Sequence, residues 1–562
     1  MQDADVIVIG AGSAGAAVAA RLSEDAHRRV LLIEAGADTP PGDVPADIRN
    51  IFPAAYFNRD YFWPGLMGSI RAGEEPVSFL QPKVMGGGSS VMGMLALRGV
   101  PGDYERWEAG GARGWGWADV LPVYQAMTCD LDAPSRNARG PNIVRRLPRE
   151  RWPAYMHRVE QVVRARGGAS HADVYEAAAD DGFFAAPLSQ DDERATSARC
   201  YLTVEARKRD NLAIMTGTRV LRLTFDGTRV TGVVAEREGR AMTLTAKEVV
   251  VSGGAVHSPA LLLRSGIGPA DELRALGIDI VADRPGVGRN YQNHTQLHFS
   301  MTLKRGTELS RGAQHYIMSA LRFSSGLEGC PGGDLFHYFT GRVSPKAFGR
   351  RMAMVAVALY TPASRGVVAL TGADPNAPLR VDQRLLSDPR DARRMVIAGR
   401  HAERLLLDPA VRECFEEVYL MPRIAPLRLI NGVGVVGAMK TAGAIAVLAS
   451  PGWLRRKIIQ AAISPGKLVA DGRNTYPLHD DDFVDASGAM FHPSSTCAIG
   501  AADSPTAVVD PECRVYGVEG LRVADASVMP NVVSANTNMA AIMIGERVAA
   551  FIRNGGASGN SQ

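Results

Sequence analysis

The stretch DVIVIGAGSAGAAVAARLSE, residues 5–24, decides the fold of this 562-residue chain. A run of β-branched apolar residues leads into Gly10-x-Gly12-x-x-Gly15, and an alanine-rich helical pattern follows. In such a turn the first glycine permits the tight bend, the second lets a pyrophosphate approach the backbone, and the third lets helix and strand pack closely. The free N–H groups at the helix start attract phosphates. The stretch therefore predicts a Rossmann-like βαβ unit that binds a dinucleotide.

A second strand-like run, RVLLIEAG (29–36), ends in Glu34, about twenty residues after the last glycine of the turn. A carboxylate at this place binds ribose hydroxyls, and it disfavours a 2′-phosphate. FAD or NAD is therefore expected rather than NADP. The alternative is a glycine-rich turn in an unrelated α/β protein, but the strand, the helix and the acid together favour the dinucleotide.

Composition excludes several other classes of protein. The chain is too long for one simple core, so two or more packed units are expected. The net charge is only +4 and the basic residues are scattered, which gives no sign of nucleic-acid binding. The histidines are dispersed, and there is no HExxH motif and no cysteine cluster, so no metal site is expected. Six cysteines without a pairing rhythm, and no signal peptide before the first strand, favour reduced thiols in a cytoplasmic protein.

Further motifs extend the pattern along the chain: PKVMGGGSSVMGMLALRG (82–99), GGAVHSPALLLRSGIGP (253–269), GVGRNYQNH (286–294) and GLRVADASVMPNVVSANTNMAAIMIGERVAAFI (520–552). Together they resemble the glucose–methanol–choline (GMC) flavin oxidoreductase family over nearly the whole length. The closest resemblance is to bacterial enzymes that oxidise 5-(hydroxymethyl)furfural and aromatic alcohols, through YFWP (61–64), GGGSSV (86–91) and RLLSDPRD (384–391).

The resemblance implies FAD as cofactor and an α/β fold, in which a Rossmann-like FAD-binding domain is joined to a substrate domain built on an antiparallel sheet flanked by helices. It also implies which residues contact the cofactor. They are Gly10, Gly12, Ser13, Ala14, Gly15, Glu34, Ala35, Trp63, Val84, Met92, Gly93, Met94, Leu95, Val220, Phe491, Asp525, Ala526 and Thr537.

Several positions depart from the family pattern. Met92 stands where members usually carry Asn, so a flavin contact must be made otherwise, through backbone groups. Val91 stands where some choline-type members carry a histidine bonded covalently to the flavin, so non-covalent FAD is expected. Tyr291 and Asn293 are departures within residues 286–294. His257, at a predicted helix start, is interpreted as structural.

The resemblance places the chemistry on His492, in SGAMFHPSSTCAIG (487–500), and on Asn536, forty-four residues later. Neutral imidazole can accept the hydroxyl proton of an alcohol, because its usual pKa of about 6.5 suits neutral pH. The developing alkoxide then releases hydride from carbon to flavin N5, and an amide N–H of Asn536 stabilises the oxygen. Pro493 restricts His492 to extended geometry. Cys497 is expected to be buried and inert.

Two other enzyme classes compete with this interpretation. A serine hydrolase is disfavoured, because no GxSxG elbow follows a strand. A GMC-fold lyase or decarboxylase, which uses FAD without net alcohol oxidation, stays open as an alternative. The intact pair of His492 and Asn536 favours alcohol oxidation, with oxygen or a quinone-type compound as the electron acceptor.

The expected FAD-binding domain is discontinuous and comprises residues 1–150, 195–297 and 500–562. Residues 151–194 and 298–499 form the expected substrate-binding cap. Apolar residues such as those of MVAVALYTPASRG (354–366) suggest a small-molecule substrate, an aromatic or apolar primary alcohol. Core packing alone could produce the same pattern.

One apolar segment, residues 427–463, fits the resemblance less well. Lys440 interrupts it and Pro451 breaks it, so a spanning helix is disfavoured. Trp453, followed by Arg455, Arg456 and Lys457, is typical of an interfacial anchor. The two hypotheses are a helical hairpin over the substrate channel and a peripheral contact with the inner membrane surface.

Overall fold

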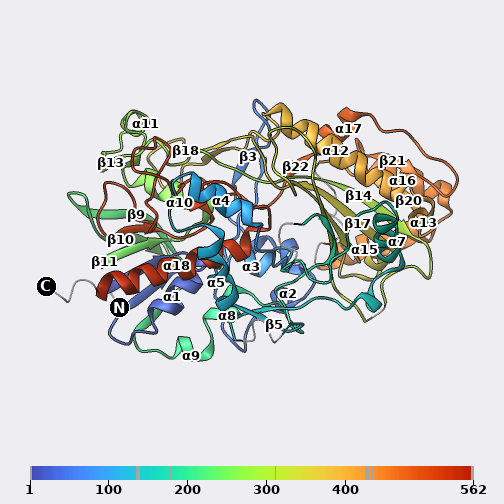
Figure 1. Cartoon of the computed structure of the whole chain (residues 1–562). Coiled ribbons are helices and arrows are strands. Elements are labelled where there is room, and N and C mark those ends of the chain that lie inside the picture. The colour runs from blue at the N-terminus through green and yellow to red at the C-terminus, as the bar shows by residue number, and fades with distance from the viewer. Residues whose placement is uncertain are drawn as a thin grey trace.

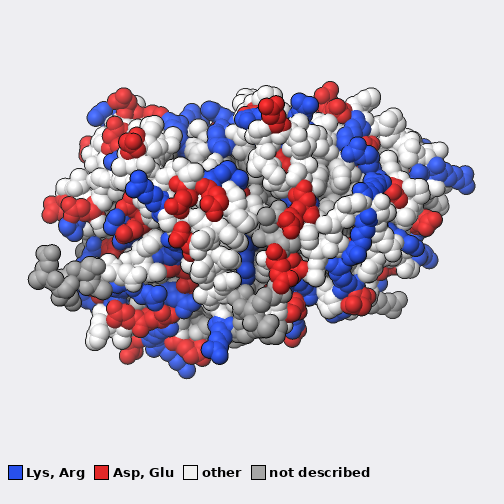
Figure 2. All heavy atoms as spheres, in the orientation of Figure 1, with Lys and Arg blue, Asp and Glu red and all other residues white. Residues whose placement is uncertain are grey.

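The structure is a computed structural model that describes residues 3–133, 139–176, 180–310, 312–423, 431 and 434–557. Two large sheets lie side by side, one toward the end of the molecule that carries both chain termini and one toward the opposite end (Figure 1). On the face drawn in Figure 2, basic and acidic side chains are interspersed over most of the surface.

The first sheet has seven strands in the order β8-β2-β1-β11-β10-β9, with β23 paired to β11. Strands β8, β2, β1, β11 and β23 run parallel, and β9 and β10 form an antiparallel meander at one edge. Buried β-branched residues of β1 and β2 explain why these two strands occupy the sheet's interior. The strand bounds are β1 Asp3–Ile9, β2 Val30–Ile33, β8 Leu212–Met215, β9 Thr218–Asp226, β10 Arg229–Arg237, β11 Arg240–Val251 and β23 Leu521–Val523.

Three helices pack at the end of this sheet that faces the cavity: α1 (Ser13–Leu22), α10 (Gly254–Arg264) and α18 (Thr537–Ala557). Helix α18, the last element of the chain, packs along α1, the first helix (Figure 1). The approach is close because Gly545 has no side chain; a Cβ there would lie 2.6 Å from the carbonyl oxygen of Ala14. The contact brings the first and the last helix of the chain together, and the starts of α1 and α18 both face the cavity.

The second sheet has eight antiparallel strands in the order β21-β20-β14-β17-β16-β15-β7, with β22 paired to β14. One face packs against α7 (Ala154–Ala165), α12 (Pro389–Leu406) and α17 (Asp480–Ala486) around a separate core. The other face looks into the cavity. The strand bounds are β7 Gly182–Ala185, β14 Thr295–Leu303, β15 Ile317–Phe323, β16 Leu335–Thr340, β17 Met352–Leu359, β20 Phe415–Leu420, β21 Lys467–Ala470 and β22 Gly488–Ala489.

A small four-stranded sheet joins the two halves of the molecule. It pairs β3 (Met67–Ser69) and β4 (Val77–Ser78) with β18 (Val367–Leu370) and β19 (Leu379–Asp382). The first two strands belong to the expected FAD-binding part and the other two to the expected cap. The domain boundaries drawn from the sequence stay a prediction.

Shorter elements connect these layers. They are α2 Ala46–Arg49, η1 Ala54–Phe57, η2 Arg59–Tyr61, α3 Gly88–Val91, α4 Pro101–Ala109, α5 Trp117–Met127, β5 Thr128–Asp130, β6 Asn142–Val144, η3 Arg149–Arg151, α8 Ser197–Tyr201, α9 Val204–Arg207, β12 Ile267–Gly268, α11 Ala270–Ala275, β13 Ala282–Asp283, η4 Ala347–Arg351, α13 Pro409–Arg412 and η5 Ala526–Val528.

The apolar segment of residues 427–463 contains two helices, α15 (Gly434–Ala449) and α16 (Gly452–Ile463), and part of it lies outside the described residues. None of the helices described is both long and apolar enough to span a membrane. The break between α15 and α16 at Pro451 matches the sequence expectation.

Candidate active site

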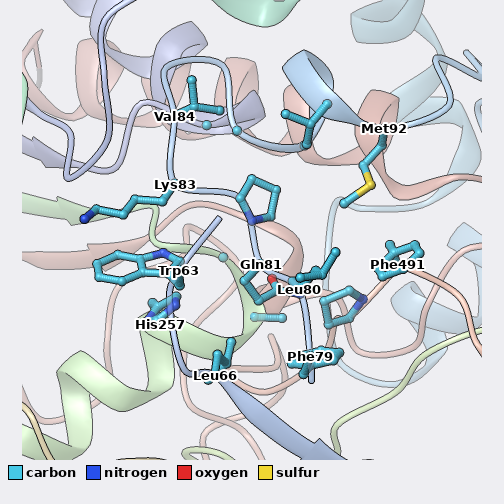
Figure 3. A pocket seen from close by; sticks show the side chains of 18 of the residues that line it. Trp63, Leu66, Phe79, Leu80, Gln81, Lys83, Val84, Met92, His257 and Phe491 are labelled. Carbon is cyan, nitrogen blue, oxygen red and sulfur yellow. The ribbon is translucent and has the colours of Figure 1, made fainter. Parts of the chain in front are cut away.

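A cavity of about 1400 Å³, bounded by both sheets, contains nearly all the residues that the sequence analysis assigned to the site. Figure 3 shows part of its wall, with Trp63 and Phe491 on opposite sides. Only Gly15 is not at the surface of the cavity. Those that line it are Gly10, Gly12, Ser13, Ala14, Glu34, Ala35, Trp63, Val84, Met92, Gly93, Met94, Leu95, Val220, Phe491, His492, Asp525, Ala526, Asn536 and Thr537.

The first glycine turn has the geometry that its sequence predicts. Gly10 has φ +95°, and a Cβ there would lie 2.4 Å from the carbonyl oxygen of Ser252. Gly15 sits where α1 meets the turn, and its Cβ would lie 1.9 Å from the carbonyl oxygen of Gly10. A Cβ on Gly12 would meet no atom within 4 Å, so the turn is open toward the cavity. The open backbone leaves room for a phosphate group.

Glu34 lies at the end of β2 and is almost fully buried at the cavity wall. Its two carboxylate oxygens accept hydrogen bonds from the backbone N–H groups of Ala11 and Gly36, each at 2.8 Å. Burial raises the pKa of Glu34, and these two N–H groups oppose the shift. Since each carboxylate oxygen can accept more than one hydrogen bond, Glu34 can also receive ribose hydroxyls.

Trp63 lines the same cavity as Glu34 and Val220. Its ring packs on the imidazole of His257, with centroids 4.4 Å apart, and Nζ of Lys83 lies 5.1 Å from the indole centroid (Figure 3). Burial lowers the pKa of His257 to about 3, so the ring is neutral and supports the indole. Phe491, by contrast, contacts Tyr56 edge-on, with centroids 5.5 Å apart.

The loop that carries Met92 is held by Arg194, a residue that the sequence analysis missed. Nη1 of Arg194 donates to the carbonyl oxygens of Met92 at 2.6 Å and Ser89 at 3.2 Å. Arg194 is fully buried, and burial lowers its pKa to about 9. Its guanidinium thus fixes the backbone of the second glycine-rich loop. Nothing in the local sequence pattern of Arg194 distinguishes it from a surface arginine.

The carboxylate of Asp525 holds the turn at Gly254 through hydrogen bonds. Its Oδ2 accepts from Gly254 N at 2.8 Å and from Ser258 Oγ at 2.5 Å, while Oδ1 accepts from Ser527 N at 2.7 Å. Gly254 has φ +79°, and a Cβ there would meet no atom within 4 Å. Asp525 therefore holds an open loop at the cavity, next to the first glycine turn.

His492 and Asn536 meet inside the cavity. Nδ2 of Asn536 lies 3.0 Å from Nε2 of His492. The other side of the imidazole contacts a second histidine, with Nδ1 of His294 at 2.8 Å from Nδ1 of His492. Oδ1 of Asn536 accepts from the hydroxyl of Tyr360 at 3.1 Å. Asn538, two residues beyond Asn536, faces away and accepts from Ser13 Oγ at 2.6 Å.

These contacts define the direction of every hydrogen bond in the group. The Asn536 amide nitrogen can only donate, so Nε2 of His492 is the acceptor. The proton of the neutral imidazole is then on Nδ1 and is donated to His294. His294 and Tyr360 were not predicted as site residues, although His294 ends the quoted motif of residues 286–294. Only the pairing across β14 and β22 brings it beside His492.

Burial keeps both histidines neutral. It lowers the pKa of His492 to about 3 and that of His294 well below its usual range, with the neighbouring His492 as a second cause for His294. A neutral His492 with a bare Nε2 at neutral pH is a proton acceptor in the cavity.

The departures at Tyr291 and Asn293 are linked in the structure. Oδ1 of Asn293 accepts from the backbone N–H of His492 at 3.1 Å, and its Nδ2 donates to Gln383 Oε1 at 3.0 Å and to the Tyr291 hydroxyl at 3.2 Å. An aspartate at 293 could accept but could not donate to either partner. The amide therefore accompanies the tyrosine, and both position the backbone of His492.

The floor of the cavity beyond the histidines comes from the second sheet. Gln296 and His298 on β14, Tyr338 on β16 and Met354 on β17 all line it. The hydroxyl of Tyr338 donates to Oε1 of Gln296 at 2.8 Å. Burial lowers the pKa of His298 to about 4, so its ring is neutral. These four residues are therefore uncharged and combine polar groups with an apolar side chain.

The residues present fit an FAD. Gly12, Gly88 and Gly254 come from three separate loops, and a Cβ on any of them would meet no atom within 4 Å. They open the backbone along the cavity that Glu34 and His492 also line. Cys497 is fully buried, burial raises its pKa, and all six cysteines are free. Within the described ranges, no three His, Cys, Asp or Glu side chains are grouped as metal ligands.

Comparison with known proteins gives consistent matches. The family model described as GMC oxidoreductase matches residues 4–296 and 362–545, in an N-terminal and a C-terminal part. The chain is 36% identical over 578 residues to a 5-(hydroxymethyl)furfural oxidase of Methylovorus sp. (strain MP688), covering 97% of this chain and 98% of that protein. It is 32% identical to an oxygen-dependent choline dehydrogenase of Sinorhizobium fredii (strain NBRC 101917 / NGR234), covering 98% and 95%. The crystal structure of pyridoxine 4-oxidase from Mesorbium loti superposes with a TM-score of 0.79 at 26% identity, covering 98% and 99%.

Proposed function

The chain belongs to the GMC oxidoreductase family, and on that basis we propose that it oxidises a primary aromatic alcohol to the aldehyde. Membership confirms the family, the fold class and the FAD cofactor expected from the sequence. It also makes the chain an FAD-dependent oxidoreductase that acts on alcohols. The substrate class, the electron acceptor and the residue roles below are the proposal.

The contact between His492 Nε2 and Asn536 Nδ2, 3.0 Å apart at the cavity wall, carries the proposal. An alcohol oxygen that comes within reach of both atoms can accept a hydrogen bond from the Asn536 amide and, in place of that amide, donate its proton to Nε2. His294 receives the Nδ1 proton of His492 and so holds Nε2 bare. Tyr360 anchors Oδ1 of Asn536, which keeps the amide nitrogen turned toward the substrate oxygen.

Bound FAD supplies the two-electron acceptor of the reaction. The residues that would hold it are the open glycine loops, Glu34 on the ribose side and the backbone fixed by Asp525 and Arg194. Val91 has no nucleophilic atom, so we propose that FAD is held without a covalent bond.

The floor of the cavity supports an aromatic substrate with a second polar group. Phe491, Tyr56 and Met354 provide apolar and aromatic contacts, while Gln296, His298 and Tyr338 offer hydrogen-bonding groups. These polar groups are uncharged, so an alcohol or ether substituent suits them better than a carboxylate or a quaternary amine. Two of the similar proteins are named 5-(hydroxymethyl)furfural oxidase and pyridoxine 4-oxidase, and the compounds in both names are heteroaromatic alcohols.

We propose molecular oxygen as the electron acceptor. Two of the similar proteins are named oxidases and a third is named oxygen-dependent, which supports this choice over a quinone. Oxygen uptake and peroxide release should match the alcohol consumed, and a soluble quinone should not increase the rate in air.

The test is an anaerobic absorbance spectrum of the purified holoenzyme. Addition of benzyl alcohol or 5-(hydroxymethyl)furfural should bleach the oxidised flavin band, and air should restore it. If no alcohol of either the aromatic or the aliphatic class bleaches the flavin, the proposed oxidation is wrong and the lyase alternative gains support. If alcohol bleaches the flavin but the colour returns only slowly in air, the proposed alcohol oxidation is supported and oxygen is rejected as the electron acceptor.

A further inference from the structure

Helices α15 and α16 carry an unusual amount of exposed apolar surface. Among the described residues, nine large hydrophobic side chains are exposed, and five of them lie on these two helices. They are Val436 (63% exposed), Met439 (69%), Ile445 (45%), Trp453 (60%) and Ile458 (40%). Figure 1 places both helices at the end of the molecule opposite the chain termini. We call these five residues, together with the two helices, the hairpin surface.

Within the part of the chain that the structure describes, only a narrow stripe of α15 is covered by other elements. Gly437 and Leu448 are buried, and Thr441 and Ala444 between them are half-buried, at a spacing of three or four residues along one helix face. The other faces are mostly alanine, glycine and large apolar residues exposed to solvent. A helix that is apolar on all sides is normally buried or in contact with lipid. The exposed faces of α15 therefore lack the cover that their composition requires.

The charge on this segment has a single sign. Residues 418–470 contain seven lysines or arginines and no aspartate or glutamate. Lys440 and Lys457 are exposed, and neither forms an ion pair with any residue that the structure describes. Arg455 corrects the sequence expectation of a surface anchor, because it is buried and its Nη2 lies 2.6 Å from Oε1 of Glu417 and 2.5 Å from Oε2 of Glu416. In the described part of this segment, the exposed cations without an ion pair are thus Lys440 and Lys457, while the half-buried Arg456 lies 3.7 Å from Asp471.

The buried side of α15 supports the wall of the substrate cavity. Leu448 and Ala444 pack against Val343, Phe348 and Met354. Val343 and Met354 also line the cavity. The exposed face of α15 is therefore one helix thickness away from the floor on which the alcohol would bind.

We propose that the hairpin surface docks on the headgroup region of a lipid bilayer that contains anionic lipids. Trp453 and the large aliphatic side chains would enter the interface, while Lys440 and Lys457 pair with lipid phosphates. A second copy of this chain fits less well, because a symmetric contact would bring the lysines of both copies together with no acid in the segment to neutralise them. The docking concerns the surface alone and does not depend on the identity of the alcohol.

The test uses the full-length holoenzyme and two kinds of vesicle, pure phosphatidylcholine and phosphatidylcholine mixed with phosphatidylglycerol. The protein should co-sediment with the mixed vesicles, and brominated lipid should quench the fluorescence of Trp453. The triple variant V436S/M439S/W453S should lose binding. The double variant K440Q/K457Q should weaken it about fivefold for each lysine removed. Steady-state alcohol oxidation in solution should be unchanged in both variants.

A matched control replaces exposed apolar residues elsewhere. Met67 and Val204 are 42% and 43% exposed and lie outside the hairpin surface, so M67S/V204S should bind vesicles like the wild type. Absence of wild-type binding to mixed vesicles, or equal loss in M67S/V204S, overturns the proposal. Self-association in light scattering that the triple variant abolishes, without vesicle binding, would identify an interface between copies instead. Failure of alcohol to bleach the flavin would reject the proposed reaction but leave the vesicle result intact.

Discussion

The Nδ1 atoms of His492 and His294 lie 2.8 Å apart, and one of them must carry the shared proton. Asn536 donates to the opposite nitrogen of His492, so the proton belongs to Nδ1 of His492 and His294 accepts it. The tautomer of the proposed base is thus determined by two neighbours from distant parts of the chain. His294 touches neither the cavity nor, by this geometry, the substrate, and it acts as a positioning residue.

Replacement of His294 by leucine removes the acceptor for Nδ1 of His492. The imidazole can then populate the tautomer with a proton on Nε2, which cannot accept one from the alcohol. We expect kcat to fall about tenfold or more with a smaller change in KM. Gln at this position keeps an acceptor oxygen, so H294Q should retain more activity than H294L. Equal loss in the two variants would point to a packing role only.

The pH dependence follows from the burial of His492. Its lowered pKa, about 3, means that the ring is neutral and competent above that value and becomes protonated only as the pH falls through it. We expect kcat/KM to stay level from neutral pH down to about pH 5. The profile should be measured with rapid anaerobic mixing. An acid limb near the ordinary histidine value of about 6.5 would contradict this account.

Arg194 should matter for FAD retention. Substitution by methionine leaves the carbonyl oxygens of Ser89 and Met92 without their donor, which loosens the loop at the cavity. We expect the FAD dissociation constant to rise about tenfold, consistent with the loss of hydrogen bonds to a charged group. Flavin-to-protein absorbance after dialysis measures this. Arg145→Met is the control, because Arg145 pairs with Asp192 at the surface. An unchanged flavin content in R194M would show that Arg194 does not contribute to FAD retention.

His298 should contribute to substrate preference. Its neutral ring can hydrogen-bond a second polar group on the substrate, so His298→Leu should raise the KM for 5-(hydroxymethyl)furfural about tenfold. Benzyl alcohol has no such group, and its KM should change little. Met354→Leu keeps the shape of the floor and is the control. A parallel rise in both KM values would argue against recognition of a distal group.

Much of this site is visible in the sequence because local rules create it. The glycine turn, the helix after it and Glu34 are close in the chain, and their geometry follows from φ values and packing that glycine alone allows. His492 and Asn536 required the family resemblance, since no local rule joins residues forty-four positions apart. Arg194, His294 and Tyr360 were missed because their roles arise from tertiary contacts between segments that are far apart in the chain. Arg455 was assigned to the surface for the same reason, as Glu416 and Glu417 precede it by almost forty residues.

The most direct test of the central claim compares flavin reduction in the wild type and in His492→Ala. With FAD bound and oxygen excluded, the variant should be reduced by benzyl alcohol about a hundredfold more slowly or worse, because the general base is absent. His337→Ala is the control, since His337 is buried in the second sheet and hydrogen-bonded to His401, outside the cavity. Normal reduction of FAD-bound His492→Ala at neutral pH would contradict the assignment of His492 as the base.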